Sequence, residues 1–320
     1  MNKNSKEYYL ELARHCGICK NDLIYPIFIT ESNQHKSLVS MPGIAKIPYH
    51  KIIDHVDNLM KKDLRTLILF GDPKKRDEKG SLSFSHNGII QKTLKLLKTT
   101  FGDKLSLISD VCICQYNKSG HCGILDTKNN QIKNDETLEY LCKIALSHSE
   151  AGADIVAPSS MMDGQVKIIR EKLNNEGYKK IKILSFSAKL SSSLYKPFRM
   201  ETFLRKNLKN LDKSSYQVSY CNRKEIIREI DSDIREGVDM VMIKPSITSL
   251  DLIYQTSKTC KLPIVVQIVS GEYSMIKAAS SIGAIDEIYY LINLIGAIKR
   301  AGGNKIISYS SLDLSRFIGR

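Results

Sequence analysis

Eight short runs of apolar, mostly β-branched residues constrain the fold of this 320-residue chain most strongly. The runs span residues 24–29, 64–70, 105–109, 154–157, 181–187, 240–243, 264–269 and 306–309. Between the runs, apolar residues recur at helical spacing, as in Ile52, Val56 and Leu59. Near-continuous apolar strands that alternate with amphipathic helices indicate a parallel sheet covered by helices. Eight such units predict an α/β fold, a closed (β/α)8 TIM barrel.

An open, doubly wound sheet is the alternative, and the sequence after the first run lacks the glycine fingerprint that would favour it. Residues 1–22 precede the first run and are expected to form a short, partly helical N-terminal arm. Residues 23–320 then form the catalytic barrel. Polar inserts at 71–85 and 200–219 follow predicted strands, so both should rise from the face where barrel enzymes keep their active sites. The second insert belongs to a lid predicted near residues 196–220.

Composition excludes several classes of protein. Hydrophobic residues make up 42% and charged residues 26%, which is ordinary globular usage and not that of a disordered or fibrous chain. No apolar segment approaches the roughly 20 residues that a membrane span requires, and the polar N-terminus does not resemble a secretory signal. The expected location is therefore the cytoplasm, with no membrane partner. The net charge is +14, but the basic residues are scattered, so no nucleic-acid partner is expected.

Three of the eight cysteines are spaced for a metal site. Cys112 and Cys114 alternate on an extended segment after the third run, so their side chains point to the same side, and glycine turns can return Cys122 to meet them. Three converging thiolates suit a tetrahedral zinc and leave one position open for water or substrate. The neighbouring His121 is assigned no ligand role. Three unrelated buried cysteines remain the alternative, because the spacing differs from common zinc fingers.

Lys189 and Lys244 each stand at the C-terminal end of a predicted strand. A lysine held in an apolar mouth near another cation has its neutral amine favoured, and that amine can attack a carbonyl to form a Schiff base. One such lysine indicates a class I aldolase. Two on neighbouring strands indicate two carbonyl substrates held side by side. For either residue alone, a lysine that snorkels out of a strand end remains the alternative.

Other polar residues near strand ends complete the candidate site. Arg199, Ser270 and Tyr309 lie at or just beyond predicted strands, where they can bind a carboxylate. The candidates for acid–base chemistry or for orienting a lysine are Asp110, Ser159 and Asp163.

Together these segments resemble the porphobilinogen synthases, also called 5-aminolevulinate dehydratases, in their zinc-dependent form. The resemblance covers nearly the whole chain and is carried by residues 22–28, 41–43, 151–158, 270–275 and 308–309, together with the three cysteines. It implies a lyase (hydro-lyase) reaction, the condensation of two 5-aminolevulinate molecules to porphobilinogen with loss of two waters, in tetrapyrrole and heme biosynthesis.

The resemblance also implies a role for each candidate residue. Lys244 matches the lysine that holds the first, P-side substrate as a Schiff base, and Lys189 matches the A-side lysine. Zinc on the three cysteines would position and polarise the second substrate. The residues matched to the carboxylate clamps are Ser270 and Tyr309 on the P side and Arg199, Lys213 and Gln217 on the A side.

The chain also departs from the family pattern. Lys213 stands where a second lid arginine is usual, so a charge remains without bidentate carboxylate binding. Lys196 replaces a glycine, and Gln267 replaces a tyrosine. Glu229 matches a glutamate at an allosteric magnesium site of some bacterial members, so magnesium is the second metal expected. The resemblance implies a homo-oligomer, with an octamer as the expected assembly, although this arm is short.

Three rival functions stay open on the residues alone. The first is a metal-binding or interaction protein that keeps the barrel without catalysis. The second is a nucleic-acid-binding protein, and the third is a class I aldolase, which should not need the three cysteines.

Overall fold

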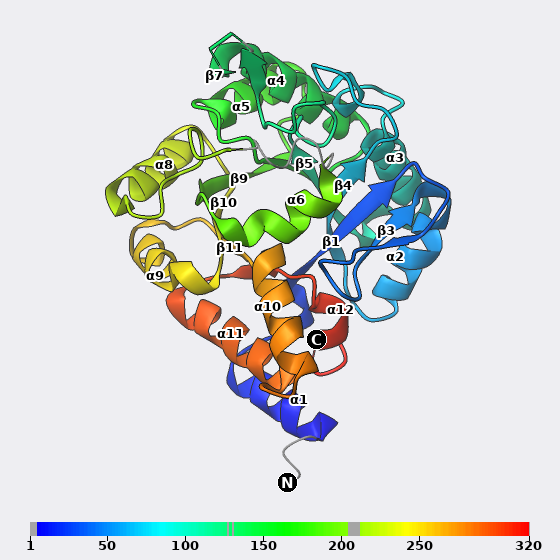
Figure 1. Cartoon of the computed structure of the whole chain (residues 1–320), viewed down its shortest axis with the longest axis vertical. Coiled ribbons are helices and arrows are strands. Elements are labelled where there is room, and N and C mark those ends of the chain that lie inside the picture. The colour runs from blue at the N-terminus through cyan, green and yellow to red at the C-terminus, as the bar shows by residue number, and fades with distance from the viewer. Residues whose placement is uncertain (1–4, 127, 130, 204–211, 320) are drawn as a thin grey trace.

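A closed ring of eight parallel strands forms the centre of the molecule (Figure 1). The computed structural model describes residues 5–126, 128–129, 131–203 and 212–319. In ring order the strands are β1 (Leu23–Thr30), β4 (Thr66–Asp72), β5 (Ser106–Val111), β8 (Ile155–Pro158), β9 (Lys182–Lys189), β10 (Met240–Lys244), β11 (Ile264–Gln267) and β12 (Lys305–Ile307). β12 pairs with β1 and closes the ring. The predicted barrel is confirmed, and each predicted run overlaps one of its strands.

Helices cover the outside of this ring (Figure 1). Those that follow successive strands are α2 (Ile52–Met60), α3 (Ile89–Phe101), α4 (Asn134–Glu150), α5 (Gln165–Asn175), α8 (Arg223–Arg235), α9 (Leu250–Thr259) and α11 (Glu287–Ala301). Shorter or additional helices are α1 (Lys6–His15), α6 (Lys196–Thr202), α10 (Ser270–Ser281) and α12 (Ser311–Leu314). Within the described part of the chain, no helix combines the length and apolarity that a membrane crossing needs.

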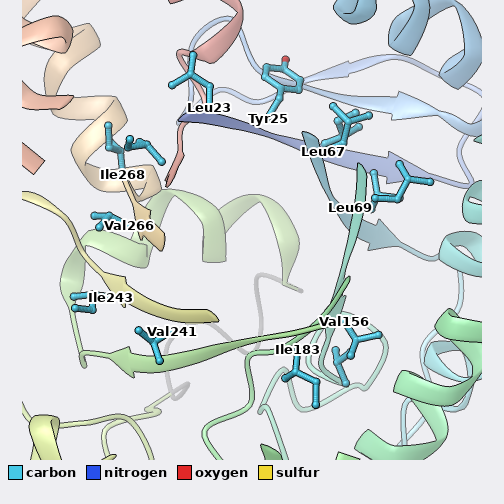
Figure 2. Close-up of a cluster of buried hydrophobic side chains, with 14 of the residues drawn as sticks. Leu23, Tyr25, Leu67, Leu69, Val156, Ile183, Val241, Ile243, Val266 and Ile268 are labelled. Carbon is cyan, nitrogen blue, oxygen red and sulfur yellow. The ribbon is translucent and has the colours of Figure 1, made fainter. Parts of the chain in front are cut away.

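Side chains of the barrel strands alternate between two apolar layers. On β4, Leu67 and Leu69 pack outward into the layer beneath the helices, whereas Ile68 and Phe70 fill the barrel interior. Figure 2 shows the outer layer, in which side chains such as Val241 project away from the ring. The period of two along each strand produces both layers at once, and a strand buried on both faces reads as a continuous apolar run.

Strand β9 breaks the alternation beside β10. The register between the two strands shifts near their C-terminal ends, so that β9 contributes one extra residue. Phe186 lies in the barrel interior and Ala188 in the outer layer. A bulge of this kind changes the face that later side chains occupy. As a result Lys189 pairs with Lys244 in register, and both side chains face the mouth of the barrel.

The predicted run at 264–269 extends beyond β11, which ends at Gln267, because α10 begins at Ser270. The Glu272 carboxylate accepts hydrogen bonds from the backbone N–H of Val269 at 2.7 Å and of Ile247 at 2.6 Å. A carboxylate in the first turn satisfies free N–H groups and complements the helix dipole. This capping turns the chain at the barrel mouth and places Ser270 there.

The N-terminal helix α1 packs against α11 of its own barrel. Tyr9 is buried and its hydroxyl donates to Asp286 at 2.5 Å, and the Tyr8 ring stacks on Tyr289 with 6.2 Å between ring centroids. The boundary between an arm of residues 1–22 and a barrel of residues 23–320 stays a prediction.

Two small additions to the barrel were not predicted. The strands β2 (Lys36–Ser37) and β3 (Ala45–Pro48) form a hairpin beside β1, and β6 (Ile124–Asp126) pairs with β7 (Gln131–Lys133).

Candidate active site

The candidate site is a pocket at the carboxyl ends of the barrel strands, with α6 lying across the mouth of the ring (Figure 1). Carboxyl-terminal strand ends are where barrel enzymes carry their catalytic groups. The predicted catalytic and substrate-binding residues that line this pocket are Asp110, Ser159, Lys189, Arg199, Lys213, Gln217, Lys244, Ser270 and Tyr309. Cys114 and Cys122 line it as well. Part of the predicted lid, residues 204–211, lies outside the described residues.

Lys189 and Lys244 share this pocket but have different neighbours. The Lys189 ammonium donates to the Ser159 carbonyl oxygen at 2.5 Å and lies 3.9 Å from the Cys122 Sγ. The Lys244 Nζ lies 4.2 Å from the centroid of the Phe186 ring and donates to the Gln267 Oε1 at 2.9 Å. Lys189 is therefore held by polar partners, and Lys244 mainly by apolar ones.

The electrostatic environment favours a neutral amine on Lys244. Burial lowers the pKa of Lys244 well below its ordinary value, and the nearby positive charge of Lys189 lowers it further. The negative charges of Asp110, Cys122 and Cys114 raise the pKa of Lys244 and so act in the opposite direction. A buried lysine with a lowered pKa can keep the free amine that nucleophilic attack on a ketone requires.

Asp110 ends β5 beneath the two lysines and is almost fully buried. Its Oδ2 accepts a hydrogen bond from the Gln115 side-chain amide at 3.3 Å, whereas its Oδ1 has no partner among the described residues. Burial raises the pKa of Asp110 to about 6, although the nearby Ser159 and the positive charge of Lys189 both lower it. A carboxyl group that titrates near neutrality can either give or take a proton.

The three predicted metal ligands meet beside Lys189. Cys112, Cys114 and Cys122 are all buried, and their Sγ atoms lie within 4.8 Å of one another. Cys112 directly follows β5, Cys114 lies in the turn that comes next, and the loop after it returns Cys122. The expected convergence of the thiols is found, but Cys114 stands on a turn closed by the Tyr116 N–H and the Ile113 carbonyl oxygen, and not on the extended segment predicted from the sequence. Soft, deprotonated sulfur ligands in a three-membered set suit zinc with an open fourth position. The triad is a metal site whose donors are consistent with zinc.

Positive groups surround the thiols on the side facing the pocket. The Lys213 ammonium lies 3.3 Å from the Cys122 Sγ and 4.6 Å from the centroid of the Phe203 ring. Hydrogen bonds from Cys112 and Cys114 lower the pKa of Cys122 well below its ordinary value, and the positive charges of Lys189 and Lys213 lower it further. The arrangement thus stabilises at least one thiolate, which is the form that binds a metal.

His121 is adjacent to Cys122 but lies outside the group of thiols that could hold a metal. Its Nδ1 lies 3.2 Å from the Tyr216 hydroxyl, which also accepts from the Cys122 backbone N–H at 3.2 Å. His121 and Tyr216 therefore brace the returning loop.

The predicted carboxylate-binding residues lie around the rim. The Arg199 guanidinium lies 3.5 Å from the Gln217 Oε1, so the two form one polar group on the lid side. Ser270 Oγ donates to the Leu194 carbonyl oxygen at 3.2 Å and accepts from the Phe198 N–H at 3.1 Å, which ties α10 to the start of α6. The buried Tyr309 ring stacks on Phe28.

Glu229 lies outside this pocket, in a neighbouring cleft between the α8 surface, the loop after β8 and the lid. The acidic residues lining that cleft are Asp163, Glu225, Glu229, Asp233 and Glu236. Burial and the charge of Asp163 raise the pKa of Glu229. The structure thus places Asp163 with Glu229 and not with the two lysines, where it was considered as an acid–base group.

Several residues in or beside the pocket were not singled out from the sequence. The Phe186 ring lies beneath the Nζ atoms of Lys189 and Lys244. The Gln115 amide donates a hydrogen bond to Asp110, and the Tyr216 hydroxyl accepts one from the Cys122 N–H. Phe186 lies three residues before Lys189 on the same strand, where strict alternation would place the two on opposite faces, so their proximity depends on the β9 bulge. Tyr216 comes from the lid, and only the tertiary fold brings it to Cys122.

Comparison with known proteins agrees with this site. A family model described as "Delta-aminolevulinic acid dehydratase" matches residues 2–317. The chain belongs to the delta-aminolevulinic acid dehydratase family. A relative of that description from Methanothermus sociabilis is 45% identical over 310 residues, covering 97% of this chain and 94% of the relative. Another from Archaeoglobus fulgidus is 42% identical over 305 residues, covering 95% and 93%.

A solved structure of the family is also similar. The delta-aminolevulinic acid dehydratase (porphobilinogen synthase) of Toxoplasma gondii ME49, in complex with the reaction product porphobilinogen, has a TM-score of 0.90 and 32% identity to this chain. The match covers 94% of this chain and 85% of that chain. Membership of the family confirms the predicted hydro-lyase activity, the condensation of two 5-aminolevulinate molecules to porphobilinogen in tetrapyrrole biosynthesis.

Proposed function

We propose that Lys244 and Lys189 each hold one 5-aminolevulinate molecule as a Schiff base, Lys244 on the P side and Lys189 on the A side. The observation that carries this proposal is the pairing of the two lysines in register at the carboxyl ends of β9 and β10, where both face one pocket. In each case the amine nitrogen bonds to the keto carbon, and the carbonyl oxygen leaves as water with both amine hydrogens.

The lowered pKa of Lys244 supports its use as the first nucleophile, because its amine needs no strong base to become neutral. Asp110 and Ser159 then act as the acid–base pair of the site. Asp110 lies within the electrostatic reach of both lysines, and its pKa of about 6 suits proton transfer at neutral pH.

The substrate carboxylates are bound around the rim of the pocket. On the P side, the Ser270 and Tyr309 hydroxyl groups donate to the first carboxylate. On the A side, Arg199, Lys213 and Gln217 bind the second. The burial of Lys213 and its place beside Cys122 support contact with a substrate that also lies next to the metal site.

Zinc is the proposed metal of the Cys112, Cys114 and Cys122 site. When bound, it supplies a Lewis acid next to the A-side substrate. The chain's own contribution is to hold three thiols buried and converging, with Lys189 and Lys213 offsetting their negative charge. Chelation should abolish porphobilinogen formation, and zinc, but not magnesium alone, should restore it.

The lysine assignment is tested with Lys244→Met and Lys189→Met, using Lys172→Met on the exposed face of α5 as the matched control. Each active-site variant should lose porphobilinogen formation by about 10⁴-fold or more, because nucleophile removal has effects of that size. The control should keep wild-type turnover. Borohydride reduction with 5-aminolevulinate, followed by peptide mass mapping, should label Lys244 in the Lys189→Met variant. If no lysine of the wild-type protein is labelled, the proposed mechanism is ruled out.

Magnesium is proposed to bind at the acidic cleft around Glu229 and to stimulate turnover. The cleft lies outside the lysine pocket, so magnesium would act on the lid and not on the reacting atoms. Glu229→Gln should remove any rise in activity during magnesium titration while leaving basal turnover and zinc content unchanged. Equal magnesium stimulation in the variant and the wild type would place the ion elsewhere.

The proposed assembly is a homo-oligomer, with an octamer as the expected state and the cytoplasm as its location. Exposed apolar side chains at Val39, Met200 and Met275 support association, and the eight unpaired cysteines support a reducing compartment. An octamer of 36.2 kDa chains would have a mass of about 290 kDa. Light scattering after size-exclusion chromatography measures this mass directly, and a monomer mass at micromolar concentration would refute association.

A further inference from the structure

Gln267 is the polar side chain closest to the reactive end of Lys244. It is the last residue of β11, and the parallel register of β10 with β11 pairs Ile243 with Val266, so residues 244 and 267 come next to each other at the strand ends. Gln267 is 4% exposed and Lys244 is 8% exposed. The Oε1 of the glutamine accepts a hydrogen bond from the lysine Nζ at 2.9 Å.

The rest of the immediate environment of Lys244 is aromatic. Its Nζ lies 4.2 Å from the Phe186 ring centroid and 5.4 Å from that of Tyr195. Aromatic faces attract a cation without fixing the direction of its N–H bonds. Among the described residues, Gln267 supplies the one directional acceptor for this amine that lies within hydrogen-bonding distance.

A neutral amide suits this position better than a carboxylate would. An amide oxygen can accept from a neutral amine as well as from an ammonium group, so it orients the nitrogen without strongly favouring the charged form. The amide oxygen faces Lys244, so the amide NH₂ of Gln267 remains for another partner. That NH₂ has no hydrogen-bond partner among the described residues, and Gln267 lines the pocket.

We propose that Gln267 is a positioning residue for the Schiff-base reaction: its Oε1 holds the Lys244 amine so that the nitrogen lone pair points at the keto carbon of the P-side substrate, while its NH₂ donates to the substrate. This inference rests on the proposed role of Lys244. The step is balanced as before, since the nitrogen–carbon double bond forms as the carbonyl oxygen leaves with two hydrogens as water.

Several charged groups also face the Lys244 amine and shape its titration. Lys189 comes from β9, Asp110 from β5, and the thiols of Cys114 and Cys122 from the loop after β5. Arg199 and Lys213 line the same pocket from the lid. The Gln267 contact is distinguished from all of these because a change at residue 267 alters the amine's nearest acceptor and leaves the other groups in place.

Two variants of Gln267 separate orientation from charge. Gln267→Met keeps the length of the side chain and removes the acceptor, so the rate of borohydride-trappable imine formation at Lys244 should fall by about tenfold, as expected for one lost hydrogen bond. Gln267→Glu places a carboxylate beside the amine, so the pH at which trapping reaches half its maximum should rise by about one unit or more. In the methionine variant turnover number should fall more than KM rises.

The matched control is Gln255→Met on α9, where the side chain accepts from Arg223 away from the pocket. Zinc content and melting temperature are measured for every variant, and Gln267→Asn, which keeps an amide on a shorter side chain, should recover part of the trapping rate. Trapping rates and pH midpoints equal to wild type in both the methionine and glutamate variants would overturn the inference. If wild-type Lys244 is never labelled, the proposed role of Lys244 fails, and this inference fails with it.

Discussion

The two lysines occupy the same pocket but belong to contrasting sides of it. The sulfur side comprises Lys189, Lys213 and the cysteines 112, 114 and 122, where ammonium groups lie 3.3–3.9 Å from the Cys122 Sγ. The aromatic side comprises Lys244, Phe186, Tyr195, Tyr309 and Gln267. On the sulfur side positive and negative groups offset one another, whereas on the aromatic side a single amine is buried with one neutral acceptor.

Under the proposed mechanism, one residue type serves two tasks on neighbouring strands. A lysine in an apolar environment loses its proton more easily and becomes a nucleophile. Lys189, in contrast, has the Ser159 carbonyl oxygen and the Cys122 sulfur as its near neighbours. The difference predicts an order of events, with the first substrate bound at Lys244 and the second recruited at Lys189.

After the loss of either lysine, the next largest effect is expected from Cys122→Ala, which removes a ligand from the sulfur side. Zinc content should fall and porphobilinogen formation should drop by at least about 100-fold, because Lewis-acid stabilisation is worth several kcal/mol. Imine trapping at Lys244 should stay within about threefold of wild type. Zinc content and borohydride trapping at Lys244 are measured on the same preparation. Cys221→Ala, at an exposed cysteine, is the control. Loss of trapping at Lys244 as well would show that the two sides are not independent.

A smaller effect is expected from Lys213→Met, which removes one cation from the sulfur side. The A-side carboxylate should bind more weakly, so KM for 5-aminolevulinate should rise by about tenfold, and Lys213→Arg should restore most of it. Imine formation at Lys244 should not change. Steady-state kinetics over a wide substrate range measures the effect. An unchanged KM would remove Lys213 from the substrate clamp.

The smallest effect concerns stability on the aromatic side. Because the folded-state pKa of Lys244 is lowered, the unfolded chain binds a proton more readily than the folded protein does, and stability falls as pH drops from about 10.4 towards the folded value. Lys244→Met removes this penalty. The variant should be more stable than wild type at pH 7 by about 1 kcal/mol, and the gap should narrow at higher pH. Urea unfolding at several pH values measures this difference in stability, and a less stable variant at pH 7 would argue against a lowered folded-state pKa of Lys244.

The barrel itself followed from periodicity, because strands buried on both faces leave continuous β-branched runs that survive in the sequence. The β2–β3 and β6–β7 pairs were missed because residues such as Lys36, Ser37 and Gln131 are exposed and carry no apolar pattern. The end of β11 was overestimated because Val269 is apolar and buried, while the Glu272 cap that begins α10 acts through tertiary contacts to Ile247.

The sequence predicted the parts of the site whose chemistry follows from residue type alone. It did not predict the parts that depend on strand register or on contacts between distant segments. The three cysteines and two strand-end lysines are conspicuous in the sequence. That Lys189 faces the pocket depends on the β9 bulge, which strict alternation from Phe186 does not anticipate. The contacts of Tyr216 with Cys122 and of Gln267 with Lys244 join segments far apart in the chain, so they required the fold.

The division of labour between the two sides is tested most directly by the distribution of borohydride-trapped 5-aminolevulinate between Lys244 and Lys189, with and without zinc. Peptide mass mapping after brief exposure to substrate gives both occupancies in one sample. The zinc-free protein should carry label on Lys244 and little on Lys189, and zinc should raise the Lys189 fraction. Equal labelling of the two lysines without zinc, or labelling of Lys189 before Lys244, would contradict the proposed order.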